Sequence, residues 1–182
     1  LVPFLGEGPK EYEVALKLGE ETNTDDWTGK VTVSQGWEGV RTEKIQGVLD
    51  EFHGRIHQIP PMFSAIKRQG KPLYRLARRG MGVEPEERTV EIYKIEMEKV
   101  DLPLVFFRVS CSKGTYIRAL GRDIGRKMGC GGHLLRLRRI RSGPFVIEQA
   151  ISWERLKEPS QPEHLNPWLI CLDAALPGLP EV

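Results

Sequence analysis

A short run between Cys111 and Arg118 holds the residue types best suited to chemistry in this chain of 182 residues. It starts where an alternating hydrophobic segment, ending at Val109, gives way to a helix-like segment. Gly114 can adopt backbone angles that other residues avoid, so it suits a tight turn from strand to helix. The Tyr116 ring can stack on a base, and the Arg118 guanidinium can hold a carboxylate or phosphate. Sites often lie at strand ends in α/β folds, although an ordinary surface turn would have the same sequence.

Two stretches of the chain are strongly basic, although the formal net charge is only +2. The first, 67–79, holds six lysines or arginines and no acid; the second, 113–141, holds nine and a single acid, Asp123. Aromatic residues are interleaved with them, namely Phe63, Tyr74, Tyr116 and Phe145. Basic residues neutralise phosphates and rings stack on unpaired bases, so this pattern predicts a nucleic-acid surface. Two solvated helical faces that happen to be basic are the alternative.

Composition excludes several classes of protein. A hydrophobic content of 40% is enough for a real core, and no stretch approaches the ~20 apolar residues of a membrane span. Residues 1–9 lack the pattern of a signal peptide. The three cysteines are odd in number and lack CxxC spacing, which favours free thiols in a reducing cytoplasm. The pair His53 and His57 lacks the glutamate of HExxH, so we expect no protein-bound metal.

Hydrophobic periodicity gives the order of the elements and predicts an α+β or mixed α/β architecture. The turn around Asp25 and Asp26 is expected to be solvated rather than catalytic. Thr42 is expected to cap a helix that ends at Gly54, and Pro72 to open a short projecting helix that ends at Gly80. The expected strands are 12–18, 89–100, 104–111 and 134–145, and a further helix is expected over 117–128.

Three sequence blocks together carry a family resemblance. They are KxY with TxTDDxxG in residues 10–29, then QIPPMFSAIKRQGKPLYRLARRG, then CSKGTYIRALGRDIGRKMGCGGHLLRLRRIRSGPF. The chain resembles bacterial tRNA pseudouridine synthase of the TruB type from its start to about residue 156. This resemblance implies the pseudouridine synthase catalytic-domain fold, of class α+β, with a mixed and mostly antiparallel sheet flanked by helices. It also implies a thumb insertion over 59–82 that binds RNA.

The resemblance implies an isomerase that acts on the uridine at position 55 in the T-loop of tRNA. Such an enzyme breaks the N-glycosidic bond, turns the detached uracil and rejoins it to the same ribose through carbon. A base must leave its stack for this reaction, and rings or apolar side chains replace the lost stacking. The family uses no metal and no organic cofactor. The implied partner is tRNA, with no membrane, and we expect a cytoplasmic monomer.

The family's functional residues match particular positions in this sequence. Tyr12 matches the tyrosine that stacks on the everted base and has been proposed as a proton acceptor. Tyr116 and Leu137 match residues that line the nucleotide pocket. Arg118 matches the arginine that pairs with the catalytic aspartate and would favour its ionised form. The basic residues expected to contact RNA are Lys67, Arg68, Lys71, Arg75 and Lys113.

The family's nucleophilic aspartate lies in a GxLDPxATG motif, and nothing in this chain matches that motif. We therefore expect the motif to precede Leu1, and we assign the nucleophile to none of the aspartates present. Residues 1–156 are expected to form part of the catalytic domain, and 157–182 to lead toward an RNA-binding PUA domain that does not appear. On this reading the chain alone binds RNA weakly and does not isomerise it.

Two other classes of protein fit the same residues. A non-catalytic RNA-binding or RNA-chaperone module would keep the RNA contacts without the chemistry. A basic ribosome-associated protein without a pocket would not depend on Tyr12 or Tyr116 for its RNA affinity. A base that stacks on an aromatic ring gains about 1–3 kcal/mol, so loss of either ring separates these readings.

Overall fold

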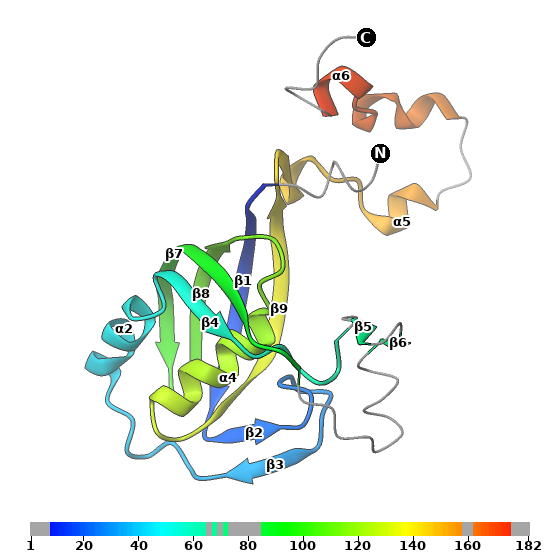
Figure 1. Cartoon of the computed structure of the whole chain (residues 1–182). Helices are drawn as coiled ribbons and strands as arrows, with labels where there is room; N and C mark the ends of the chain where they lie inside the picture. Colours follow the sequence, from blue (N-terminus) through cyan, green and yellow to red (C-terminus); the bar gives the residue numbers. More distant parts are fainter. Residues whose placement is uncertain (1–7, 65–66, 69–70, 73–84, 158–161, 176–182) are drawn as a thin grey trace.

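A computed structural model describes residues 8–64, 67–68, 71–72, 85–157 and 162–175. The centre of the fold is a six-stranded sheet (Figure 1). Its strands lie in the order β10-β9-β1-β8-β7-β4, and every neighbouring pair is antiparallel. The strands are β1 (Lys10–Leu18), β4 (Gly54–Gln58), β7 (Arg88–Asp101), β8 (Leu104–Cys111), β9 (Gly132–Ser142) and β10 (Phe145–Val146). The fold class is α+β, as the sequence predicts.

Smaller elements surround this sheet. Two hairpins stand apart from it: β2 (Glu20–Thr22) with β3 (Val31–Ser34), and β5 (Lys67–Arg68) with β6 (Lys71–Pro72). The helices that follow or interrupt the strands are α2 (Thr42–Asp50), α4 (Ile117–Lys127), η1 (Ile147–Gln149), α5 (Trp153–Leu156), η2 (Pro162–Trp168) and α6 (Leu172–Ala175). No helix in the described residues is long and apolar enough to cross a membrane.

One face of the sheet carries the hydrophobic core. Alternate residues of β1 and β8 point to it because side chains along a strand point to opposite faces in turn. Leu16 and Phe107 are fully buried there. Helices α2 and α4 pack on this face, and Leu49 and Leu120 join the same buried cluster. The charged side chains of the strands point to the other face and form ion pairs across it, such as Arg108 with Glu13 and Glu98.

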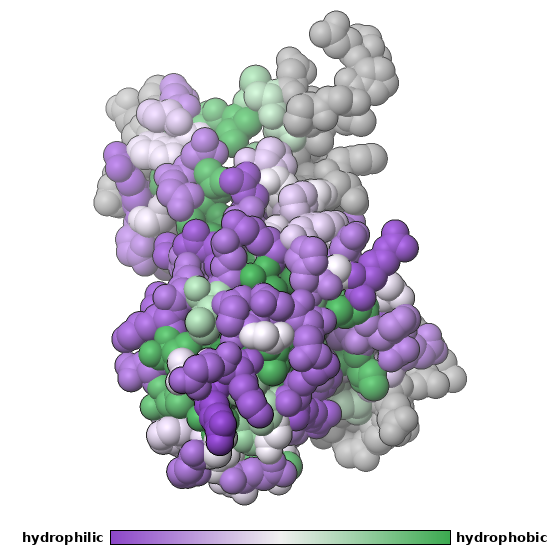
Figure 2. Space-filling view, turned by 90° about the vertical axis from the view of Figure 1, so that its left-hand side faces the viewer, coloured by the Kyte–Doolittle hydropathy of each residue, from purple (hydrophilic) through white to green (hydrophobic). Residues whose placement is uncertain are grey.

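Apolar side chains also reach the surface in places. On the side of the molecule shown in Figure 2, they form small patches that hydrophilic residues separate. Such scattered exposure is normal for a folded domain and by itself indicates no function.

Helix α4 lies so close to β9 that glycine at two of its positions matters for the contact, and at Gly125 the neighbouring atoms are backbone. A Cβ atom at Gly125 would overlap the backbone of Gly131 and Gly132, and one at Gly121 would collide with the side chain of Leu134. The backbone at Gly125 has no flexible side chain opposite it that could yield. The small residues of α4 therefore set the distance between the helix and the sheet.

Replacing Gly125 by alanine should destabilise the fold by about 1–3 kcal/mol, because the backbone it meets must shift. Gly47, on the exposed side of α2, is the matched control, since nothing lies within 4 Å of the position of its missing Cβ. Gly47→Ala should stabilise the fold by about 0.5–1 kcal/mol through its higher helix propensity. Urea denaturation measures both changes, and equal effects of the two substitutions would contradict this account of the helix–sheet contact.

The structure corrects two expected helix starts. Thr42 is the first helical residue of α2 rather than its cap; Arg41 precedes the helix and no side chain caps it. Pro72 lies in the strand β6 rather than at the start of a helix. The remainder of that expected helix, 73–80, lies outside the described residues. The expected strand 134–145 is divided, because β9 ends at Ser142 and β10 is a separate short strand.

Candidate functional site

The turn from β8 into α4 is held by a compact set of hydrogen bonds. Gly114 has φ +90°, the left-handed conformation that its sequence position predicts. Gln58, which is buried, accepts from the Tyr116 backbone N–H at 2.8 Å and donates to the Tyr116 carbonyl at 3.1 Å. Because the Tyr116 backbone is bound at both groups, the residue enters α4 in one fixed position.

Arg118, in the first turn of α4, joins three separate segments. Its Nη1 donates to the carbonyl of Thr24 and to a carboxylate oxygen of Asp26, each at 3.1 Å. Its Nη2 donates to the carbonyl of Phe63 at 2.9 Å. The guanidinium thus ties the helix to the polar turn 22–29 and to the proline-rich segment that begins the expected thumb. A planar fork held at both terminal nitrogens has little freedom to reorient.

Asp26 is the carboxylate partner of Arg118. Burial opposes its ionisation, but hydroxyl groups of Thr28 and Thr24, the Thr28 N–H and Arg118 outweigh this, so the pKa of Asp26 is lowered. The hydroxyl bonds are 2.5 Å from Thr28 and 2.8 Å from Thr24. Asp26 therefore stays ionised beside Arg118 at neutral pH.

The neighbouring Asp25 is buried, and it forms an ion pair with Arg122 at 3.0 Å. Burial raises the pKa of Asp25, Arg122 lowers it and the nearby Asp123 raises it further. The expectation that Asp25 and Asp26 are solvated turn residues is therefore wrong. Both carboxylates point toward α4, where arginines recur every four residues along one face of the helix.

Tyr12 lies near the end of β1 where that strand meets β8 and β9. It is opposite Val109 on one side and Arg139 on the other. Burial raises the pKa of the Tyr12 phenol, and the nearby Cys111 raises it further, whereas Arg139, which hydrogen-bonds the phenol, lowers it. The net direction is upward, so the phenol is neutral at physiological pH. A neutral ring with one buried face is suited to stacking.

Leu137 is paired with Val14 across the β1–β9 ladder and is 43% exposed. Val14 and Tyr12 are two residues apart on β1, so Leu137 and Tyr12 belong to the same face of the sheet, which is also the face that α4 covers. The structure thus brings Tyr12 and Leu137 together on one face, and it places Tyr116 and Arg118 at the start of the helix that packs there.

The basic residues expected to contact RNA are distributed differently. Lys67, Arg68 and Lys71 lie on the β5–β6 hairpin, and Lys113 lies in the turn before α4. Arg75 is outside the described residues. The catalytic and the RNA-contact assignments stay predictions.

The basic stretch 113–141 is not the uniformly cationic surface that its sequence indicates. Six of its nine cations form ion pairs with acids, most of which come from distant segments. The pairs are Arg118 with Asp26, Arg122 with Asp25 and Asp123, Arg126 with Glu21, Lys127 with Glu51, Arg138 with Glu13, and Arg141 with Glu11. Much of the positive charge is therefore neutralised within the fold.

Sequence reasoning missed Asp26 and Gln58 as parts of this site. The adjacent acids of the TNTDD turn were a visible signal for Asp26, because two carboxylates side by side need cations nearby if they are buried. Gln58 gave no such signal, since its role depends on a backbone 58 residues further along the chain. In the described part of the chain no group of three or more acids, histidines or cysteines could hold a metal ion.

Comparison with known protein families shows which family this chain belongs to. The family model for the TruB family pseudouridylate synthase N-terminal domain matches residues 1–117, and the model for the tRNA pseudouridylate synthase B C-terminal domain matches residues 118–176. The chain belongs to the TruB family of pseudouridylate synthases.

Individual relatives agree with this assignment. The tRNA pseudouridine synthase B of Geobacter sulfurreducens is 46% identical over 175 residues, which cover 96% of this chain and 58% of the relative. The chain therefore spans a little over half the length of this curated relative.

Solved structures give the same fold. A Cbf5-Nop10-Gar1 complex contains a chain that is 31% identical, with a TM-score of 0.68 over 96% of this chain and 45% of that one. A chain of an H/ACA RNP bound to a substrate RNA containing 2'-deoxyuridine is 30% identical, with a TM-score of 0.55 over 82% of this chain and 33% of that one.

Proposed function

We propose that a protein containing this chain isomerises the T-loop uridine of tRNA, at position 55, to pseudouridine. The observation that carries the proposal is the Arg118 guanidinium, fixed by three hydrogen bonds at the start of α4, two residues after Tyr116. A fixed guanidinium can orient a nucleophilic carboxylate and keep it ionised. In this reaction the bond from N1 to the ribose breaks and a bond from C5 to the same ribose carbon forms; the hydrogen on C5 leaves as a proton and N1 takes up a proton, so the product is an isomer of the substrate.

Each site residue has a role in this proposal. Tyr12 and Leu137 pack on the two sides of the everted uracil, and Tyr116 lines the ribose end of the pocket. Arg118 binds the nucleophilic carboxylate while it also holds the Asp26 carboxylate. Because its pKa is raised, the Tyr12 phenol does not act as a phenolate at neutral pH, which supports a stacking role for the ring. No metal or organic cofactor takes part in these steps.

The proposed RNA contacts are those that the sequence predicts. The β5–β6 hairpin and the segment that follows it grip the T-loop through Lys67, Arg68, Lys71 and Arg75. Lys113 contacts the same RNA from the turn before α4. Since tRNA is modified where it is made and used, we place the protein in the cytoplasm, where its three thiols remain reduced. We propose that it acts as a monomer.

A chimera tests the proposal. The segment of the Geobacter sulfurreducens relative that precedes the matched region would be joined to this chain, and tritium release from tRNA labelled at C5 of uridine would be measured. The chimera should release tritium, and the 182-residue chain alone should not. Replacing the nucleophilic aspartate of the added segment by asparagine is the matched control and should abolish release.

Release by the chain alone would leave the proposed activity standing and would mean that one of the chain's own residues serves as the nucleophile. One outcome would contradict the proposed activity itself. A folded chimera that binds tRNA without releasing tritium would instead favour a non-catalytic RNA-binding or RNA-chaperone module.

A further inference from the structure

Two exposed arginines of β9, Arg136 and Arg139, have no ion pair among the described residues, but Arg139 hydrogen-bonds the Tyr12 phenol. Arg136, on β9, is exposed and has no ion pair among the residues that the structure describes, whereas Arg138 and Arg141 on the same strand are paired with Glu13 and Glu11. Arg136 lies opposite Ala15 in the ladder, so no acid is directly opposite it on β1, and the diagonal Glu13 pairs with Arg108 and Arg138 instead. An exposed guanidinium without an internal counter-charge can bind an external anion.

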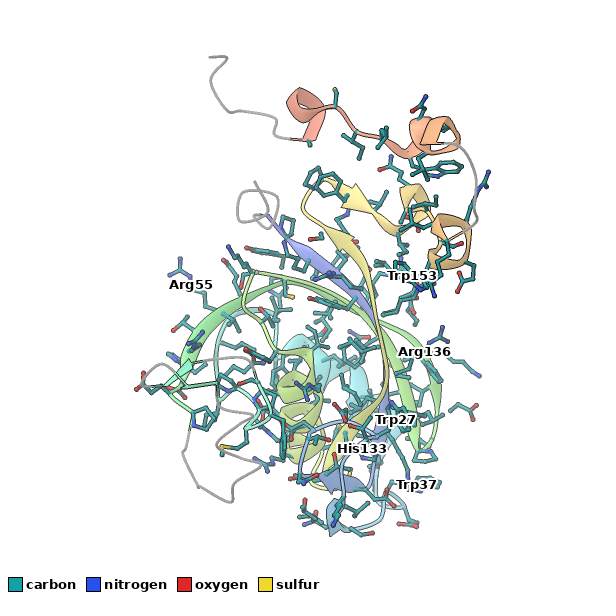
Figure 3. The ribbon with its side chains drawn as sticks, turned by 90° about the vertical axis from the view of Figure 1, so that its right-hand side faces the viewer. Trp27, Trp37, Arg55, His133, Arg136 and Trp153 are labelled. Carbon is teal, nitrogen blue, oxygen red and sulfur yellow. The ribbon has the colours of Figure 1, made fainter. Side chains whose placement is uncertain are left out.

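A large aromatic ring lies next to this cation. Trp27 is 65% exposed, although its backbone is tightly held. The Trp27 backbone N–H donates to the Leu134 carbonyl at 2.8 Å, and the preceding Asp26 forms an isolated parallel bridge with Leu134. This bridge places Trp27 level with Leu135 and beside Arg136, and Figure 3 shows Trp27 and Arg136 together next to β9.

The turn that carries Trp27 is rigid for reasons already described. The Asp26 carboxylate accepts from the Thr28 N–H at 3.0 Å and from Arg118 at 3.1 Å, so the residues on both sides of the indole are bound. The indole of Trp27 is therefore exposed on a backbone that is held in place. Leu135, which is 41% exposed, adds apolar surface beside it. We call Trp27, Leu135 and Arg136 the edge patch.

The edge patch lies at an open edge of the sheet. On the side away from β1, β9 pairs with β10 at Arg141 and Ser142 and with Asp26 at Leu134. Between these points, the described part of the chain pairs no strand with that edge. In sequence the patch adjoins two residues of the proposed uridine site, because Asp26 precedes Trp27 and Leu137 follows Arg136. Arg136 pairs with Ala15 and Leu137 with Val14, so the two side chains point to opposite faces of the sheet, and an RNA that contacts both must pass over this open edge.

We propose that the edge patch binds a second, unpaired nucleotide of the RNA substrate, with its base stacked on Trp27 and its phosphate bound by Arg136. This inference rests on the proposed function, since it adds a contact to the same RNA. An exposed rigid ring beside an unpaired cation fits a nucleotide because a nucleotide presents a flat base and an anionic phosphate together. A protein strand added at the open edge would use the β9 backbone instead of these side chains.

Binding of a T-arm hairpin RNA to the 182-residue chain, measured by fluorescence anisotropy over a range of salt, tests the inference. Trp27→Ala should weaken binding at least about fivefold, because one base stack is worth ~1 kcal/mol or more. Trp27→Phe should lose less, since it keeps a ring. Arg136→Ala should weaken binding and lower the slope of log affinity against log salt by about one.

Two matched controls lie elsewhere on the surface. Trp153 on α5 is 63% exposed, so Trp153→Ala removes an equally exposed ring. Arg55 on β4, the opposite edge strand of the sheet, is exposed, and no ion pair involves it in the described residues. Figure 3 shows Arg55 on the far side of the molecule from Trp27, and Trp153 on the same side as the patch, with Arg136 between it and Trp27. Trp153→Ala and Arg55→Ala should bind the hairpin as the unchanged chain does.

A second measurement does not depend on variants that must fold. The chain has four tryptophans, and labelling with 5-fluorotryptophan gives each its own fluorine NMR signal. The hairpin should shift the Trp27 signal and leave the Trp153 signal in place. A Trp27 signal unchanged at saturating RNA would overturn the inference.

The outcomes separate this inference from the proposed function. If Tyr116→Ala weakens binding and the two edge-patch variants do not, the edge patch is wrong and the uridine pocket stands. If the edge-patch variants weaken binding and Tyr116→Ala does not, the RNA contact stands and the pocket is wrong. If the chain binds no RNA, the edge patch is wrong, and tritium release by the chimera still decides the proposed function.

Discussion

Replacing Arg118 by methionine in the nucleophile-restored chimera should lower the rate of pseudouridine formation by about 10²–10³-fold, the usual loss for removal of a fixed electrostatic partner of the reacting groups. The affinity for tRNA should change little, because Arg118 acts on the carboxylates and not on the bulk of the RNA. Methionine fills a similar volume and removes the three hydrogen bonds to Thr24, Asp26 and Phe63. Single-turnover kinetics with saturating enzyme separates the rate from the affinity.

Arg126, two turns further along α4, provides the control. It forms a bidentate pair with Glu21 at 2.8 and 2.7 Å, but its own side chain is 57% exposed. Arg126→Met should therefore leave the rate within about threefold of the unchanged chimera, since Arg126 contacts neither Arg118 nor Asp26 and its own side chain is exposed, although Glu21 is 12% exposed. Arg118→Lys keeps the positive charge but lacks the planar guanidinium with its two terminal nitrogens. It should therefore recover only a small part of the rate that Arg118→Met loses. A normal single-turnover rate with a large loss of affinity would contradict the role assigned to Arg118.

The parts of the fold that depend on local periodicity were predictable from the sequence. The strand 104–111 was predicted with the bounds that β8 has, because its buried and exposed residues alternate without interruption. The start of α4 was predicted because Gly114 marks the turn before it and the apolar residues that follow recur at helical spacing. In both places the local pattern and the tertiary packing require the same conformation.

Strand β9 shows where local periodicity fails. The β1–β9 ladder shifts register between Ala15 and Leu16, so Leu134 and Leu137, three residues apart, pair with Leu16 and Val14 on the same face of β1. Strict alternation would place them on opposite faces. A bulge adds one residue to a strand and leaves no clear mark in sequence composition, so the face of each β9 residue could not be predicted.

The charge of the candidate site was mispredicted for a related reason. Counting nearby residues finds the cations of α4 and β9, but the acids that pair with them are far away in the sequence, as in the pair of Arg118 with Asp26. Only the sheet topology brings β1 and the 22–29 turn against these elements. A basic stretch in a sequence therefore indicates an RNA surface only where its cations are not paired with acids of the same chain.

Replacing Arg122 by methionine should destabilise the fold by about 3–5 kcal/mol at neutral pH, the cost of removing one partner from a buried ion pair. The side chains of Arg122 and Asp25 are 11% and 10% exposed, so water cannot replace the lost partner. Arg122 also donates to the Ile59 carbonyl and to Asp123, each at 2.9 Å, and these bonds are lost as well. Urea denaturation followed by circular dichroism measures the change, and Arg126→Met should cost no more than about 1 kcal/mol.

The pH dependence of this loss has a definite sign. Burial already raises the pKa of Asp25, and Arg122 opposes that rise, so removing Arg122 should raise it further. An acid whose folded pKa exceeds its unfolded value contributes stability below the unfolded pKa, and that contribution is lost as the pH rises through the folded pKa. The deficit of Arg122→Met relative to the unchanged chain should therefore be smallest in acid and should grow toward neutral pH.

A second substitution separates the buried charge from the lost packing. Adding Asp25→Asn to Arg122→Met removes the unpaired carboxylate and should restore part of the lost stability at neutral pH. Asparagine suits this position because the residue has φ +60°, a conformation that asparagine tolerates. If the double variant is no more stable than Arg122→Met at any pH, the uncompensated Asp25 charge is not the cause. The loss would then come from the packing and the hydrogen bonds of the arginine, and the Asp25–Arg122 ion pair would contribute nothing to holding the 22–29 turn against α4.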